Sequence, residues 1–157
     1  MSGVWGPKDR GRVPLFDRLI DEEPERAREA VPRRVLGAAA LRESIRRELV
    51  RVLETRCPWP GDVALSRERT ALDYGLPDLD QGGRGLVAER RARLARLVKH
   101  TIESFEPRLT NIEVEVTDTG ESRTRAVVSL RAEILTADHP EPFTLSLPVG
   151  AGGANVG

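Results

Sequence analysis

The chain has few of the residues on which most cofactor and nucleic-acid sites depend. Its 157 residues include one cysteine, two histidines and 4% aromatic residues. A single cysteine, Cys57, cannot form an internal disulfide, and no CxxC or HExxH motif marks a metal site. Scarce aromatic side chains leave few platforms on which bases could stack. The sequence therefore predicts no cofactor, no metal and no small-molecule substrate.

An excess of charge is also lacking, because 25 basic and 25 acidic residues cancel. Free-standing nucleic-acid-binding domains usually carry a clear basic excess, so no nucleic-acid partner is expected. No apolar run reaches the roughly 18 residues of a membrane span. The N-terminal sequence also lacks the apolar core of a secretory signal. We therefore expect a cytoplasmic protein without direct membrane insertion.

The charges that are present divide the chain. Residues 84–99 carry a net charge of +5, whereas residues 101–147 carry a net charge of −5. The two segments either complement each other inside one domain or dock different partners, since charge complementarity sets orientation and partner choice.

The two ends of the chain are predicted to lie outside the main domain. Residues 1–13 have no hydrophobic period and read as a flexible tail, and residues 149–157 form a Gly-rich tail. Residues 14–36 are predicted to hold a short docking helix and a linker. Pro14 precedes apolar residues at helical spacing, and so short a helix must dock on something to be stable. Its apolar positions are Leu15, Phe16, Leu19 and Ile20.

Residues 37–148 are predicted to form an α+β domain, with two main helices packed on a three-stranded antiparallel β-meander. Apolar residues lie on one helical face at Leu41, Ile45, Leu49, Val52 and Leu53, and a second helix covers about 86–104. Residues between these helices, including 72–79, read as a loop. After Pro107 the period changes to two, over 112–116, 126–134 and 143–147.

The most informative constellation is Glu106-Pro107-Arg108, where helix must become strand. A partly buried charge at such a junction is tolerable only when it is paired. We interpret the two side chains as a polar lock, bonded to each other or to a partner. The catalytic alternative makes Glu106 a glycosidase-type general acid, with Asp78 as a conceivable second carboxylate. A nearby Arg108 opposes that role, because it would keep Glu106 ionised.

Four segments in order resemble the TssE family of type VI secretion baseplate subunits, within the phage-tail wedge (GPW-like, "lysozyme-like") proteins. They are Leu15–Leu19, Glu43–Leu49, Tyr74–Leu79 and Phe105–Leu109. The resemblance implies a non-enzymatic wedge subunit in a cytoplasmic baseplate docked at the inner membrane. Implied partners are wedge subunits of the TssF, TssG and TssK type and sheath subunits of the TssB and TssC type.

The same resemblance implies that the subunit templates the first ring of the contractile sheath. A three-stranded sheet has two outer strands, and strand addition at one of them fits this role. The residues expected to bind partners are Phe16, Leu19, Tyr74, Leu76, Asp78, Phe105, Glu106, Pro107 and Arg108. The alternative function is a peptidoglycan-cleaving hydrolase that uses Glu106. The Gly-rich end after Leu147 leaves the extent of the last strand open.

Overall fold

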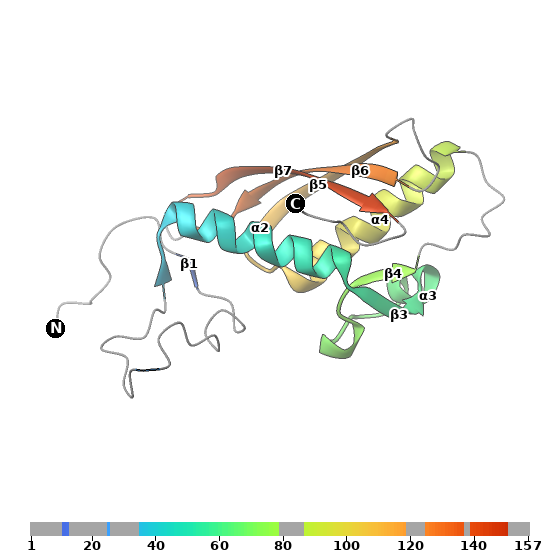
Figure 1. Ribbon diagram of the computed structural model, residues 1–157, viewed down its shortest axis with the longest axis horizontal. Helices are drawn as coiled ribbons and strands as arrows, with labels where there is room; N and C mark the ends of the chain where they lie inside the picture. Colours follow the sequence, from blue (N-terminus) through green and yellow to red (C-terminus); the bar gives the residue numbers. More distant parts are fainter. Residues whose placement is uncertain are drawn as a thin grey trace.

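The protein is represented by a computed structural model, which describes residues 11–12, 25, 35–78, 87–118, 125–136 and 139–150. Its main layer is a three-stranded antiparallel sheet in the order β5-β6-β7 (Figure 1). The strands are β5 Leu109–Asp118, β6 Arg125–Ile134 and β7 Glu141–Gly150. The predicted α+β class and three-stranded antiparallel sheet are confirmed.

Side chains of the sheet alternate between the core and the solvent, as the period of two predicts. Along β6, Val128, Leu130, Ala132 and Ile134 are buried, while Arg131 between them is exposed. Within the part of the chain that the structure describes, one face of the sheet is thus covered and the other faces solvent. β7 pairs with β6 as far as Gly150, two residues beyond the boundary expected at 148.

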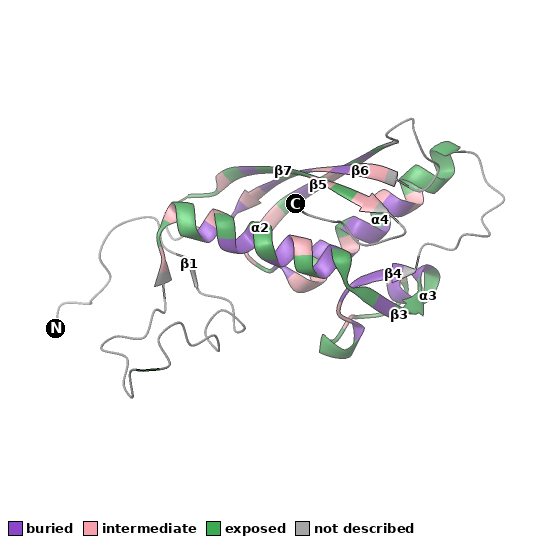
Figure 2. Cartoon of the chain, viewed as in Figure 1, coloured by how far each residue is buried: buried purple, intermediate pink, exposed green. Residues whose placement is uncertain are grey.

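Two long helices cover the buried face. Helix α2 spans Ala38–Glu54 and α4 spans Val87–Phe105. Helix α2 contacts α4 and β7, and α4 contacts β5. All five apolar positions of the predicted first stripe are buried, and they join α4 and the sheet in one core (Figure 2). No helix of the described residues is long and apolar enough to cross a membrane.

The segment between the helices is more regular than expected. It contains β3 Arg56–Pro60, α3 Gly61–Leu65, the 3-10 helix η1 Ala71–Asp73 and β4 Leu76–Asp78. We call residues 56–78 the β3–β4 unit; it lies beyond the C-terminal end of α2 (Figure 1). The expectation of a loop at 72–79 is wrong for Leu76–Asp78, which pair in parallel with β3. These strands were not predicted because they contain Pro58, Pro60 and Pro77, and proline in a sequence usually argues against a strand.

A second difference lies at the N-terminal side of α2. β1 Gly11–Arg12 pairs antiparallel with β2 Val35–Leu36, inside segments expected to be a tail and a linker. Two-residue strands leave no hydrophobic period to detect. The predicted helix with Phe16 and Leu19 lies outside the described residues, as do residues 151–157.

Candidate functional site

The Glu106-Pro107-Arg108 motif forms a closed ion pair where α4 becomes β5. Arg108 Nε donates to Glu106 Oε1 at 2.6 Å, and Nη2 donates to Oε2 at 2.5 Å. The Glu106 residue is only 2% exposed, and the Arg108 side chain is 15% exposed. Of the two alternatives for the polar lock, the structure shows the internal one: each charge is satisfied by the other.

The same arginine connects three elements. Its Nη1 donates to Ser44 Oγ on α2 at 3.1 Å, and its backbone carbonyl accepts a hydrogen bond from Leu135 N, just after β6, at 2.8 Å. Pro107, between the paired residues, is exposed. The ion pair therefore fixes the angle between α4 and β5 and presents Pro107 at the surface.

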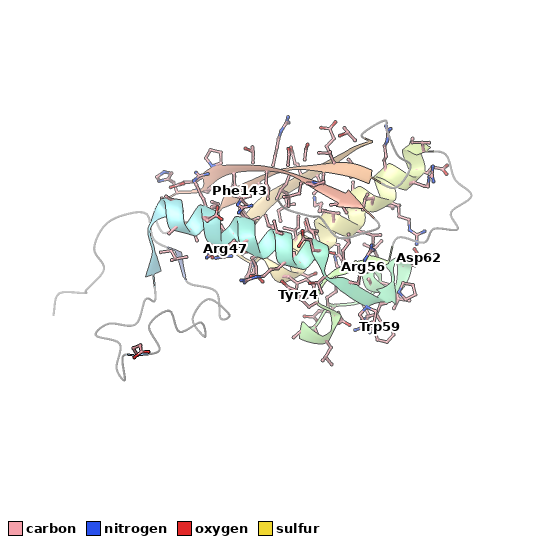
Figure 3. The ribbon with its side chains drawn as sticks, in the orientation of Figure 1. Arg47, Arg56, Trp59, Asp62, Tyr74 and Phe143 are labelled. Atoms are coloured by element: carbon pink, nitrogen blue, oxygen red, sulfur yellow. The ribbon has the colours of Figure 1, made fainter. Side chains whose placement is uncertain are left out.

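Tyr74 and Phe105, both predicted site residues, lie together. Their rings meet edge to face with centroids 5.2 Å apart. The Tyr74 hydroxyl donates to Glu48 Oε1 on α2 at 2.9 Å. Burial and, next, this hydrogen bond hold the pKa of Tyr74 above its usual value. Figure 3 shows Tyr74 beside α2 and Trp59 further out on the β3–β4 unit.

Arg69 attaches the β3–β4 unit to α4, a role that sequence reasoning missed. Its guanidinium lies 4.8 Å over the Phe105 ring and donates to Thr101 Oγ1 at 2.7 Å. It also donates to the carbonyls of Asp73 and Gly75, both at 2.5 Å. Within the described residues its buried Nε has no hydrogen-bond partner.

Asp73 organises the outer turn of the same unit. The buried carboxylate accepts from Thr70 N at 2.7 Å, Trp59 Nε1 at 2.6 Å and Arg67 Nη2 at 2.5 Å. The Thr70 amide and then Arg67 hold the pKa of Asp73 well below its usual range. The spacing Thr70-x-x-Asp73 is that of a capping box, a signal present in the sequence. The adjacent Leu72 is 88% exposed.

The other predicted partner residues are placed as follows. Leu76 is 1% exposed and belongs to the core. Glu106 is also buried. Asp78 ends β4, and its side chain, like all of Phe16 and Leu19, lies outside the described residues. Among the described residues no group of His, Cys, Asp or Glu side chains could hold a metal ion.

The described residues thus form an α+β module, in which two helices cover one face of a three-stranded antiparallel sheet and the Glu106–Arg108 pair joins α4 to β5. Residues 39–139 match the model of the family described as baseplate wedge protein gp25. The chain belongs to this family. The resemblance to phage-tail wedge proteins is thereby confirmed.

Solved structures are similar to this chain at low sequence identity. A candidate tail lysozyme from Geobacter sulfurreducens is 17% identical with a TM-score of 0.52, covering 73% of this chain and 94% of its own. A chain of the baseplate complex from the type VI secretion system is 18% identical with a TM-score of 0.49, covering 71% and 95% respectively. No curated protein sequence matches significantly.

Proposed function

We propose that the protein is a structural baseplate subunit of a type VI secretion system, of the TssE type. In this role it joins wedge subunits of the TssF, TssG and TssK type and templates the polymerisation of TssB/TssC-type sheath subunits. It works in the cytoplasm, in a baseplate docked at the inner membrane. The observation that carries the proposal is membership of the baseplate wedge family over residues 39–139.

The chemistry of Glu106 supports a structural role over a hydrolytic one. A glycosidase acid must hold a proton and reach the glycosidic oxygen. Both Glu106 oxygens instead accept hydrogen bonds from Arg108, and the residue is 2% exposed. Both oxygens are therefore occupied by an arginine of the same chain, and neither is available to a glycosidic oxygen.

The predicted partner surface then divides into contact and positioning residues. Pro107 is exposed and available for direct contact. Phe16, Leu19 and Asp78 remain proposed docking positions. Glu106 and Arg108 are positioning residues, because their ion pair fixes the place of Pro107 and the start of β5. Tyr74 and Phe105, packed on each other, hold the β3–β4 unit in place.

The sheet supplies the means of templating. Its outer strands β5 and β7 each pair on one side only within the described sheet. Strand addition at a sheet edge gives affinity through backbone hydrogen bonds and register through alternating side chains.

Gene deletion with complementation tests the function. Loss of contractile sheaths on deletion, with rescue by the wild type, supports it. We expect Pro107→Ala to weaken co-purification with the wedge subunits, whereas Arg46→Ala, an exposed change on α2, has no effect. Normal sheath assembly without the protein would overturn the proposal.

A turbidity assay on purified peptidoglycan tests the alternative. We expect no clearing by the wild-type protein. Clearing that disappears in Glu106→Gln would instead identify a hydrolase.

A further inference from the structure

The two outer strands of the sheet differ in their suitability for strand addition. β5 is interrupted by a bulge, because its pairing with β6 shifts between Thr110 and Glu113, with Asn111 at a positive φ of 51°. Its solvent face carries the exposed carboxylates of Glu113 and Glu115. Bulges and charges are devices that protect a sheet edge. β7 has no bulge, since its register with β6 is continuous from Glu141 to Gly150.

The hydrogen bonds show which backbone groups of β7 face outwards. Successive residues of β6 direct their N–H and C=O groups alternately towards β5 and β7. Leu135 N donates to Arg108 O, so the backbone groups of Leu135 point towards β5. The backbone groups of Glu133, and of every second residue before it in β6, therefore also point towards β5. Their partners on β7 therefore direct their own backbone groups away from β6. These partners are Pro142, Thr144, Ser146 and Pro148.

Two independent observations agree with this assignment. Pro142 O accepts a hydrogen bond from Arg42 Nη1 at 2.9 Å, so this carbonyl does face away from β6. Proline cannot donate to a ladder and is confined to positions where its nitrogen faces outwards. Pro142 and Pro148 both occupy such positions.

We propose that a neighbouring subunit adds an extended segment to the outer edge of β7, bonded to the backbone of Thr144 and Ser146. Among the described residues no strand pairs with this edge. Pro142 and Pro148 have no N–H donor, and the Pro142 carbonyl already accepts a hydrogen bond from Arg42. The added segment can therefore pair with β7 only between these two prolines. The prolines thereby fix the register of the added strand. This inference rests on the proposed templating function and assigns it to one edge.

Side chains of β7 define the chemistry of the added segment. On the core face Phe143 is buried, but Leu145 and Leu147 are only half-buried. An added strand with apolar residues at alternate positions would cover them. On the solvent face Thr144 and Ser146 are exposed and uncharged, so the added strand needs no charged side chain opposite them. The side chains of β7 thus fit a strand of alternating apolar and polar residues, and the proposed templating role assigns this strand to a sheath subunit.

Proline substitution tests the assignment, because it removes a donor without disturbing the β6–β7 ladder. We expect the double variant Thr144→Pro/Ser146→Pro to weaken strand addition at least about tenfold, which corresponds to about 1.4 kcal/mol. The yield of sheaths formed with co-expressed TssB/TssC-type subunits should fall accordingly. The matched control Thr144→Ala/Ser146→Ala keeps both N–H groups and should assemble like the wild type.

The competing edge is tested in the same assay. Val114 pairs with Leu130, so its backbone groups face the free edge of β5. Val114→Pro, compared with Val114→Ala, should leave assembly intact. Normal assembly by the double-proline variant, or a loss confined to Val114→Pro, would overturn the inference while leaving the templating role standing. Failure of the wild type to support assembly would instead refute the proposed function.

Amide hydrogen exchange on the unmodified full chain gives a test that is independent of variant folding. The Thr144 and Ser146 amides should exchange quickly in the free protein and at least about tenfold more slowly in the assembly. The Leu145 amide, which faces β6, should be slow in both states. Protection that appears at Val114 and Val116 instead would contradict the inference.

Discussion

Arg108 holds both carboxylate oxygens of Glu106, two residues earlier in the chain, across the exposed Pro107. An almost identical fork exists on the surface of α2, where Arg46 Nε and Nη2 donate to the two oxygens of Glu43 at 2.9 and 2.8 Å. The two pairs share chemistry and differ in burial, so they make a matched comparison.

Removing one partner of the buried pair should be strongly destabilising. Glu106→Ala leaves the guanidinium of Arg108 uncompensated, and we expect the free energy of unfolding to fall by about 3–5 kcal/mol. Glu43→Ala should have little effect, because exposed pairs are screened by water. Urea denaturation of both variants measures the difference. Equal effects would show that burial does not govern the strength of the Glu106–Arg108 pair.

Tyr74 should resist ionisation in the folded protein. Burial and the hydrogen bond to Glu48 raise its pKa above the ordinary value of 10.0. The resulting stabilisation is complete below pH 10 and is lost as the pH rises above it. Tyr74 is the single tyrosine of the chain, so phenolate absorbance reports it directly.

Tyr74→Phe provides the control for that titration. It should lose the stability that comes from the hydrogen bond to Glu48, about 1–2 kcal/mol near neutral pH. The variant should also lose the decline in stability that Tyr74 causes at alkaline pH. A phenolate titration of the wild type at the ordinary pH would contradict the buried environment of this ring.

Asp73 should make the β3–β4 unit sensitive to acid. Its pKa is depressed by the Thr70 amide and Arg67, so its stabilisation is complete above the ordinary value of 3.8 and is lost as the pH falls below it. We expect the stability difference between wild type and Asp73→Asn to shrink only below that pH.

Trp59 offers the readout for this titration, because its indole N–H donates to Asp73. Fluorescence in a Trp5→Phe background isolates Trp59, since the chain has two tryptophans. A difference between the two proteins that stays constant down to pH 2 would show that ionised Asp73 is not what holds the turn.

Gly75 is the less able of the two glycines in the β3–β4 unit to accept a side chain. Its φ of +113° is unfavourable for other residues, and a Cβ would lie 2.6 Å from the Thr55 carbonyl oxygen. Gly75→Ala should therefore cost more than about 1 kcal/mol in thermal or urea unfolding. At Gly37 a Cβ meets nothing within 4 Å, so Gly37→Ala should have a much smaller effect. Similar losses at both glycines would contradict this explanation.

Regular hydrophobic patterns allowed the core residues of this fold to be predicted from the sequence. The α2 stripe and the alternation along β6 each follow the geometry of one element, so their burial was predictable from local spacing alone. The internal Glu106–Arg108 pair was one of two alternatives, because a proline junction with flanking charges requires a partner but does not identify it.

The β3–β4 unit could not be predicted from hydrophobic patterns. Its strands are short and contain prolines, and its stability depends on Arg69, which contacts Thr101 thirty-two positions along the chain. No local period encodes such a contact. The Thr70–Asp73 capping box was visible in the sequence, but its extension to Trp59 and Arg67 required the folded chain.

The sequence by itself determined which faces of the long elements are buried and where α4 must end, because side-chain period and Pro107 act within a few residues. Only the tertiary structure decided that Glu106 is buried and paired with Arg108. It also decided that the backbone groups of Pro142 and Pro148 on β7 point away from β6. Both outcomes depend on strand register and helix packing, which are set by contacts between residues far apart in the chain.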